Sequence, residues 1–306
     1  MKILLTINKT LPRGDKVEED GGYNNLFLPM KELGHDVYFY DTVNSEEKYS
    51  KIIETFKPDL IFCCMTGDPS LTPCEPWEEI GAETLSGRTK TFNWFCDDTW
   101  RFDNFSSQAC FKFHVCSTPE PSYLERYRNI GYSNIILGVW FSNANFHPYI
   151  EFEKKNTEMS FAGRIDFLRE PYLNFLKIKG IPVTNVTNVS RSDLMRSFSE
   201  SKIGLNFSVN PNDPQRKTQM KARMIEVPAG NSLLLTEYHH GIEELFEIDK
   251  EIITWKTATE LYEKAKFLLA NPQISKKIAK NGHTRFTRDH DSKRRIEQIL
   301  SEIERL

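Results

Sequence analysis

Short apolar runs alternate with amphipathic stretches along the first part of the chain. The apolar runs predict strands at residues 2–8, 37–40, 60–65, 91–95, 113–116 and 134–139. The amphipathic stretches predict helices at residues 21–33, 46–56 and 119–129, with a polar connection over residues 11–20. This order of elements indicates an α/β fold with a parallel, doubly wound sheet.

A charged, apolar-poor segment at residues 148–157 reads as a linker, and the pattern then restarts. Strands are predicted at residues 159–162, 181–186, 202–207, 233–236 and 251–255, and helices at residues 169–179, 194–201, 219–227, 242–246 and 258–270. We therefore predict Rossmann-like domains over residues 1–150 and 151–288, and a C-terminal helix over 289–306. One arrangement of this helix packs it back on the N-terminal domain. Two such domains commonly bind a small ligand in the cleft between them.

Residues 216–237 are the most informative stretch. Helical spacing predicts an apolar stripe of Met220, Met224 and Val227 and a neighbouring polar face of Gln219, Arg223 and Glu226. A turn at residues 230–232 leads into a short buried strand. Such a helix fits a ligand site at the edge of a parallel sheet, and it equally fits a surface helix with one intrahelical ion pair.

Asp97 and Asp98 follow a predicted strand and are flanked by Trp94 and Trp100. Carboxylates accept hydrogen bonds from sugar hydroxyls, and indole rings cover the apolar faces of sugars. An aspartate that caps the next helix explains the same residues equally well.

Gly21 and Gly22 precede a predicted helix, where backbone amides can approach an anion without a Cβ in the way. A plain turn is the commoner explanation of such a pair. The six cysteines lie between Cys63 and Cys116 without a C-x-x-C pair, so we expect reduced structural thiols and no zinc site. Asp289 and Asp291 resemble a metal-binding pair, but Asp291 or Ser292 fits better as a helix cap, and we expect no metal.

The net charge is −3, from 40 basic and 43 acidic residues, which gives no global case for binding nucleic acid or an anionic membrane. No apolar run approaches the roughly 18 residues of a membrane span, and the opening residues are too short for a signal-peptide core. We therefore expect a cytoplasmic protein.

The chain resembles the GT-B glycosyltransferases of the CgeB-like group, close to the group-1 and family-4 glycosyl transferases. The motifs that carry the resemblance are Ser160-Phe-Ala-Gly-Arg164 with Arg169, Ser201-Lys-Ile-Gly-Leu-Asn206, and Gln219 to Gly230, with Leu233 to Glu237, Glu243 to Phe246 and His290 to Arg295 further on. In the first half, Gly21-Gly22, Leu33 to Val37 and Trp94 to Asp98 are similar to the family's opening and its acidic motif.

The resemblance implies two domains that face a central cleft, with a nucleotide sugar, expected to be UDP-linked, held by the C-terminal domain. It implies that Glu226 binds the ribose hydroxyls and that cationic side chains neutralise the leaving diphosphate, which would remove the need for a metal or another cofactor. The implied donor-binding residues are Gly21, Gly22, Gly163, Arg164, Arg169, Asn206, Lys221, Arg223, Glu226, Gly230, Asn231 and Ser232.

The family-4 pattern has a glutamate where this chain has Thr218. Retaining stereochemistry is therefore not carried over. An inverting enzyme needs a general base, for which Asp98 or Asp97 is the candidate, with Trp94 and Trp100 beside the acceptor. In a retaining enzyme these aspartates would only orient the acceptor.

Two alternatives stay open at this point. The basic cluster of Arg216, Lys217, Lys221 and Arg223 is compatible with a modified base in DNA as acceptor, although the net charge disfavours it. The fold also permits a non-catalytic binding protein. The sequence names neither the sugar nor the acceptor, which could belong to a glycan, a protein or a small molecule, and it does not give the oligomeric state.

Overall fold

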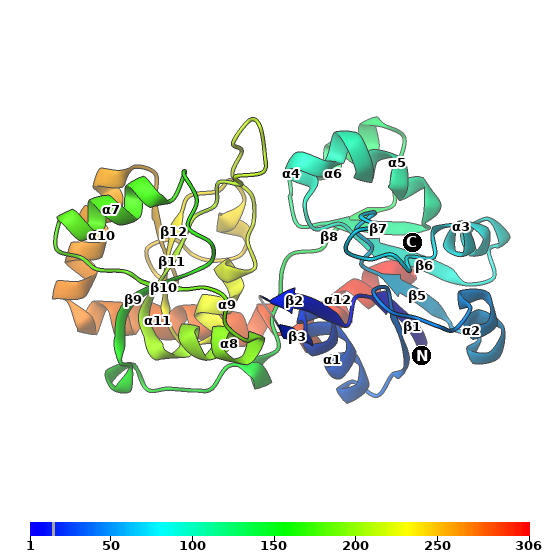
Figure 1. Ribbon diagram of the computed structural model, residues 1–306, viewed down its shortest axis with the longest axis horizontal. Helices are drawn as coiled ribbons and strands as arrows, with labels where there is room; N and C mark the ends of the chain where they lie inside the picture. The colour runs from blue at the N-terminus through cyan, green and yellow to red at the C-terminus, as the bar shows by residue number, and fades with distance from the viewer. Residues whose placement is uncertain (14–15) are drawn as a thin grey trace. The chain divides into compact units, whose positions relative to one another are not determined.

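The computed structural model describes residues 1–13 and 16–306, and the chain divides into two compact units. One unit comprises Met1–Val139 together with Arg295–Leu306, and the other comprises Trp140–Arg294. Residues 148–157 thus belong to the second unit, where Phe152 and Lys155 are buried. Each unit contains one parallel sheet, as the sequence predicts (Figure 1).

The first sheet has six parallel strands in the order β4-β1-β5-β6-β7-β8. Their bounds are β1 Lys2–Ile7, β4 Asp36–Asp41, β5 Leu60–Cys63, β6 Lys90–Trp94, β7 Val115–Thr118 and β8 Ile135–Leu137. The strands connect through helices η1 Tyr23–Phe27, α1 Leu28–Glu32, α2 Tyr49–Phe56, α3 Trp77–Ser86, α4 Asp98–Arg101, η2 Phe102–Ser106, α5 Ser107–Ala109, η3 Cys110–Lys112 and α6 Tyr123–Asn129. Crossover helices between parallel strands make the sheet doubly wound.

The first unit also contains elements that the sequence pattern does not predict. The polar connection at residues 11–20 contains an antiparallel hairpin of β2 (Thr10–Arg13) and β3 (Lys16–Glu19), although residues 14 and 15 lie outside the described part of the chain. Residues 67–88, where the sequence pattern predicts no element, contain helix α3. The buried residues of α3 are Ile80 and Glu83. A buried face of two residues, one of them charged, is too short to show as an apolar pattern in the sequence.

The second sheet has five parallel strands in the order β10-β9-β11-β12-β13. Their bounds are β9 Thr157–Ala162, β10 Thr184–Val186, β11 Ser201–Asn206, β12 Leu233–Glu237 and β13 Ile253–Trp255. The helical elements are η4 Ala144–Phe146, η5 Phe152–Lys154, α7 Glu170–Ile178, α8 Arg191–Glu200, α9 Arg223–Ala229, η6 Ile242–Glu244 and α10 Ala258–Ala270. Leu233, Leu234 and Leu235 have no exposed surface, as expected for a strand with both faces covered by helices.

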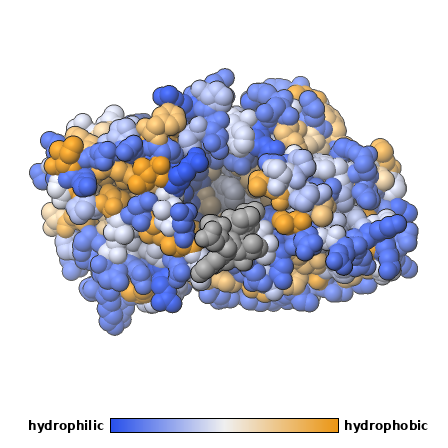
Figure 2. Space-filling model, viewed as in Figure 1, coloured by the Kyte–Doolittle hydropathy of each residue, from blue (hydrophilic) through white to orange (hydrophobic). Residues whose placement is uncertain are grey.

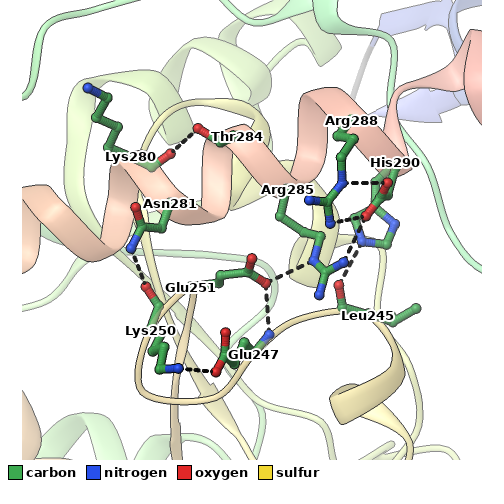
Figure 3. A network of polar contacts seen from close by, with 11 residues as sticks. Leu245, Glu247, Lys250, Glu251, Lys280, Asn281, Thr284, Arg285, Arg288 and His290 are labelled. Carbon is green, nitrogen blue, oxygen red and sulfur yellow. Dashed lines mark hydrogen bonds and ion pairs between the residues drawn. The ribbon is translucent and has the colours of Figure 1, made fainter.

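The chain ends in α11 (Pro272–Arg285), η7 (Phe286–His290) and α12 (Ser292–Arg305). Figure 3 shows Arg285 of α11 reaching Glu251, with Nε 2.9 Å from Oε2, and Arg285 also pairs with Asp289. The two arginines beside it, Arg288 first, hold the pKa of the Asp289 carboxyl well below its ordinary value. Asp291 accepts a hydrogen bond from the Lys293 amide at 3.1 Å, which confirms it as the cap of α12.

Residues Arg295–Leu306 complete the first unit. Their apolar side chains are buried, and these are Ile296, Ile299, Leu300 and Ile303. Lys90 at the start of β6 donates a hydrogen bond from Nζ to the carbonyl of Ile303 at 3.3 Å. The first 139 residues therefore do not cover their own core.

Hydrophilic residues predominate on the face shown in Figure 2, and apolar residues lie there in separate small groups. Within the described part of the chain, no helix combines the length and the apolar character needed to cross a bilayer.

Candidate functional site

Several polar side chains meet at the carboxyl edge of the second sheet. β9, β11 and β12 end there, and α7, α8 and α9 begin close by because each helix follows a parallel strand. This edge is where open α/β sheets bind ligands, and helix N-termini add partial positive charge to it. The local sequence thus brings together groups suited to an anion.

Arg169 and Arg223 share one aromatic surface at this edge. Their guanidinium carbons lie 5.6 and 5.4 Å from the centre of the Phe161 ring. Burial and then the charge of Arg169 lower the pKa of Arg223 to about 10. Two guanidinium groups that disfavour each other's charge are stabilised together by an anion between or beside them.

Arg169 is held by its own loop. Its Nη1 donates to the carbonyl of Arg164 at 2.8 Å and lies 3.1 Å from Asp166 Oδ2. Nε of Arg169 is buried and has no hydrogen-bond partner among the described residues. Burial lowers the pKa of Arg169 although Asp166 partly compensates. The buried Nε is thus a donor that no protein group satisfies. The side chain of Arg164 itself is exposed.

Asn206 contacts Arg223 and has no exposed surface with which to bind a ligand. Its side chain is fully buried, its Oδ1 accepts a hydrogen bond from Arg223 Nε at 3.1 Å, and its Nδ2 donates to Thr236 Oγ1 at 2.9 Å. The prediction that Asn206 contacts the donor directly is therefore corrected. Asn206 is a positioning residue that sets the direction of the Arg223 guanidinium.

Gly163 makes room for this arrangement. Its φ is +147°, and its amide donates to the carbonyl of Val186 at 2.9 Å. A Cβ at this position would lie 3.2 Å from Arg223 Nη1 and 3.2 Å from the Phe161 ring. Glycine is thus required both by the backbone conformation and by the closeness of the arginine.

Glu226 lies one turn into α9 and is almost completely buried. Its Oε1 accepts a hydrogen bond from Nη2 of Arg191, the first residue of α8, at 2.7 Å. The alternative of a surface helix with an intrahelical ion pair is therefore wrong. Arg223 bonds to Asn206 and Glu226 bonds to another helix, so the two side chains do not neutralise each other by direct contact.

Gln219 and Lys221 precede the helix. α9 begins at Arg223, so the predicted helix at residues 219–227 starts too early. The Gln219 side chain instead accepts a hydrogen bond from Asn210 Nδ2 at 2.8 Å and orders the loop after β11. The Lys221 carbonyl accepts from the Met224 amide at 2.9 Å. Thr218, in the position of the family's first glutamate, bonds through Oγ1 to His239 Nδ1 at 2.9 Å.

The predicted anion cradle at Gly230, Asn231 and Ser232 is wrong. These residues follow the C-terminal end of α9 and precede β12, so they lie at the opposite edge of the sheet from Arg223. The hydroxyl of Ser232 and the carbonyl of Gly230 are occupied by Lys155, whose Nζ lies 3.0 and 2.9 Å away. Burial lowers the pKa of Lys155 to about 7.

In the first unit, the structure separates the roles of Asp97 and Asp98. Asp98 is fully buried and accepts hydrogen bonds from Tyr127 Oη at 3.1 and 2.9 Å. Burial raises the pKa of Asp98 to about 6, although bonds from Ser106, Thr118 and Tyr127 oppose the rise. A side chain enclosed in this way does not reach an acceptor, and we correct its assignment as the catalytic base.

Asp97 precedes α4, is partly exposed and lines a small pocket of about 40 Å³ at the carboxyl ends of β5 and β6. It occupies the N-cap position, but its side chain makes no capping bond. Trp94 lines the same pocket and donates from Nε1 to the carbonyl of Gly138 at 2.7 Å. Trp100 is half-buried, and its Nε1 has no partner among the described residues.

Gly21 and Gly22 open the first helical segment beside β1. A Cβ on Gly22 would lie 2.6 Å from Ile7 Cδ1 and 3.1 Å from the carbonyl of Asn8. Close packing of the helix start on the strand thus accounts for Gly22. Gly21 and Gly22 belong to the first unit and Arg223 belongs to the second.

Part of the chain is similar to a known family. Residues 153–301 match the family model described as glycosyl transferase-like. A comparison with curated protein sequences finds no match.

Solved structures show that the whole chain has the GT-B fold of glycosyltransferases. Sucrose-phosphate synthase from Thermosynechococcus elongatus is similar with a TM-score of 0.65 and 10% identity, over 99% of this chain and 98% of that one. A glycosyltransferase from Rickettsia africae gives 0.63 and 11%, over 99% and 98%. Anabaena HepE in complex with UDP gives 0.62 and 11%, over 100% of both chains.

The sequence did not predict the contacts of three residues of the second unit, Arg191, Glu237 and Lys155. Arg191 is far from Glu226 along the chain, so spacing gives no signal for the pair. Glu237 ends β12 and accepts from the amides of Ser208 and Val209 at 2.8 and 3.0 Å, which fixes the loop after β11. Lys155 stood in a stretch taken for a linker. It is one of two adjacent lysines, Lys154 and Lys155, in a charged segment, so the sequence does not set it apart.

Proposed function

We propose that this chain transfers a sugar from a nucleotide sugar, most simply a UDP-sugar, to a hydroxyl group of an acceptor. The paired guanidinium groups of Arg169 and Arg223 carry this proposal, because they form a fixed positive site in which Arg169 is buried and Arg223 is half-buried, one helical turn before Glu226. HepE, with the same fold, has been solved with UDP and with UDP-glucose. We also propose that the chain belongs to the CgeB-like group of GT-B glycosyltransferases.

The chemistry follows from the charges. The bond from the sugar C1 to the diphosphate oxygen breaks, and the nucleoside diphosphate leaves with the electron pair. The acceptor oxygen forms the new bond to C1 and releases its proton. Arg169 and Arg223 stabilise the charge that grows on the leaving diphosphate, so the reaction as proposed needs no metal ion.

Glu226 is the proposed ligand of the ribose hydroxyls. Arg191 holds its Oε1, and an ionised carboxylate has lone pairs enough for further donors. On the acceptor side, Asp97 replaces Asp98 as the carboxylate proposed to contact the acceptor hydroxyl, with Trp94 and Trp100 as apolar surfaces. The acceptor class proposed is a hydroxyl on a glycan, protein or small molecule.

We also propose that the protein works in the cytoplasm. All six cysteines are free thiols, which suits a reducing compartment.

The test is release of the nucleoside diphosphate from a panel of nucleotide sugars, with and without a chelator. We expect one donor, UDP-linked, to be turned over at a rate that the chelator leaves unchanged. Glu226→Ala should weaken UDP binding by about 10-fold or more, the value of a hydrogen bond to a charged group. The matched control is the exposed Glu263→Ala on α10.

Absence of both binding and turnover with every donor would contradict the proposal, as would equal UDP affinity of Glu226→Ala and the native chain. Acceptor class is read from a labelled sugar. Nuclease-sensitive label would identify DNA, and label in glycan, protein or small-molecule fractions would identify the others.

A further inference from the structure

Two thiols lie side by side in the small pocket of the first unit that Asp97 and Trp94 line, which we call the acceptor-side pocket. The sulfur atoms of Cys64 and Cys96 are 3.6 Å apart. Cys64 directly follows β5 and Cys96 lies just beyond β6, and these two strands are neighbours in the parallel sheet. Both side chains are partly exposed, and both line the pocket that Asp97 and Trp94 also line.

The other cysteines have different surroundings. Cys63, Cys110 and Cys116 are buried, and Cys74 points its thiol at the carbonyl of Val43, 3.8 Å away. A small disulfide in solution therefore reaches Cys64 and Cys96 more readily than the three buried thiols. Access and a neighbouring thiol are the two conditions for forming an intramolecular disulfide by exchange.

We propose that Cys64 and Cys96 form a reversible disulfide that switches the acceptor-side pocket. The oxidant is a small-molecule disulfide of the glutathione class. The sulfur atoms must approach by roughly 1.5 Å to reach the bonded distance of about 2.05 Å. A movement of that size is within reach of side-chain rotation and a small shift of the two strand ends.

The exchange proceeds in two balanced steps. The Cys64 thiolate attacks the small disulfide, forms a mixed disulfide and releases one small thiol. The Cys96 thiolate then attacks Cys64 Sγ and releases the second small thiol. The two protein thiols lose two protons and two electrons in total, and the oxidant gains them.

The contact between the thiols favours this order. The hydrogen bond with Cys64, and then burial, raise the pKa of the Cys96 thiol. Cys96 therefore stays protonated until Cys64 has reacted. Once Cys64 is in the mixed disulfide, the charge repulsion between two thiolates no longer opposes ionisation of Cys96. The first attack therefore falls to Cys64.

The consequence for function rests on the proposed glycosyl transfer. The pocket has a volume of only about 40 Å³, so a shift of its wall displaces Asp97 and Arg101 relative to anything bound there. Misplacement of reacting groups by about 1 Å costs up to 100-fold in rate. The residues proposed to bind the nucleotide, Arg169, Arg223 and Glu226, belong to the other unit. Oxidation is thus expected to lower transfer while UDP binding stays the same.

The experiment treats the full chain with mixtures of reduced and oxidised glutathione. The remaining thiols are then alkylated, and the peptides are mapped by mass spectrometry. We expect a peptide pair joined through Cys64 and Cys96, with one hydrogen lost from each thiol, and its disappearance on reduction. The Cys96→Ser variant should trap Cys64 as a mixed disulfide with glutathione, and the control Cys74→Ser should keep the cross-link.

Each outcome decides a separate point. Retention of both thiols in fully oxidised glutathione, or a cross-link between other cysteines, overturns the disulfide. A cross-link that leaves transfer unchanged, where we expect a fall of about tenfold or more that reductant reverses, overturns the switch. Failure of every nucleotide sugar as a donor counts against the proposed function, whereas the peptide map still decides the disulfide.

Discussion

Arg191 and Glu226 form an ion pair between the first turns of α8 and α9, with Arg191 Nη2 2.7 Å from Glu226 Oε1. Only 15% of the arginine side chain and 4% of the glutamate side chain are exposed. Glu226 is therefore held in one orientation by a residue of another helix before any ligand arrives. A carboxylate with a fixed direction loses little conformational entropy when it binds a second partner.

Replacing Arg191 with methionine should destabilise the second unit. The change leaves the buried Glu226 carboxylate without its cation, and breaking a buried pair from one side costs about 3 to 5 kcal/mol. Denaturant unfolding of the variant measures this loss. Arg196→Met on the exposed face of the same helix is the control, with an expected change within about 0.5 kcal/mol. Equal stability of the Arg191 and Arg196 variants would contradict a structural role for the pair.

Loss of the Arg223 guanidinium should weaken UDP binding. Charge-assisted hydrogen bonds to phosphate are the stronger kind, so we expect Arg223→Met to raise the Kd for UDP by about 10- to 100-fold. Titration calorimetry measures the affinity. Asn206→Ala should give a smaller loss, because the cation remains but its direction is no longer fixed. The exposed Lys177→Met at the far end of α7 should bind as the native chain does, and an equal loss there would show a non-specific charge effect.

Asp98 should make stability fall as pH rises through the weakly acidic range. Its pKa is raised to about 6 in the folded chain, by burial, from an ordinary value near 4. The folded state thus binds the proton more tightly than the unfolded state. The contribution is fully present below about pH 4 and is lost as pH rises through 6.

The measurement compares the unfolding free energy of the native chain with that of Asp98→Asn at several pH values. The difference should change by about 3 kcal/mol between pH 4 and pH 7, in favour of the variant at the higher pH. Asp103→Asn, which removes an exposed carboxylate, controls for general effects of charge. A flat difference would mean that Asp98 titrates normally.

Lys155 should act in the opposite direction. Burial lowers its pKa to about 7, far below the ordinary value of a lysine, so the folded state binds this proton less tightly than the unfolded state. Stability from this residue therefore rises between pH 7 and about pH 10, by at most about 1.4 kcal/mol per pH unit. Lys155→Met should lose the pH dependence, as well as the bonds to Gly230 and Ser232.

The neighbouring Lys154→Met is a matched control for Lys155, because Lys154 is exposed and pairs with Glu151. Thermal unfolding of the three proteins across this pH range gives the comparison. If Lys154→Met and Lys155→Met follow the same curve, the buried lysine does not titrate as described.

The strands were predictable because buried parallel strands are nearly continuous apolar runs, as in Leu233 to Leu235. The start of α9 was not predictable from the sequence pattern. Met220 continues the apolar spacing of Met224 and Val227, yet it is buried from a loop, so periodicity extended the helix too far. The hairpin of β2 and β3 has a polar sequence, and its pairing depends on backbone bonds that side-chain patterns do not report.

The candidate site was predictable where one residue carries its own signal. Gly163 and Arg223 are of this kind, because each lies in a sequence motif that carries the resemblance to a known family. The difference between Asp97 and Asp98 was not visible, because burial by Tyr127 depends on α6, the helix that follows the next strand, β7. The Arg191 partner of Glu226 likewise depends on tertiary contact alone.

The return of residues 295–306 to the first unit bears on the order in which the protein folds during synthesis. The apolar side chains of Ile296, Ile299 and Ile303 leave the ribosome after residues 140–294, yet they belong to the unit that begins at Met1. Residues 140–294 can fold while the first unit still lacks residues 295–306. Synthesis from the N-terminus therefore finishes the second unit before the first, the reverse of the usual order.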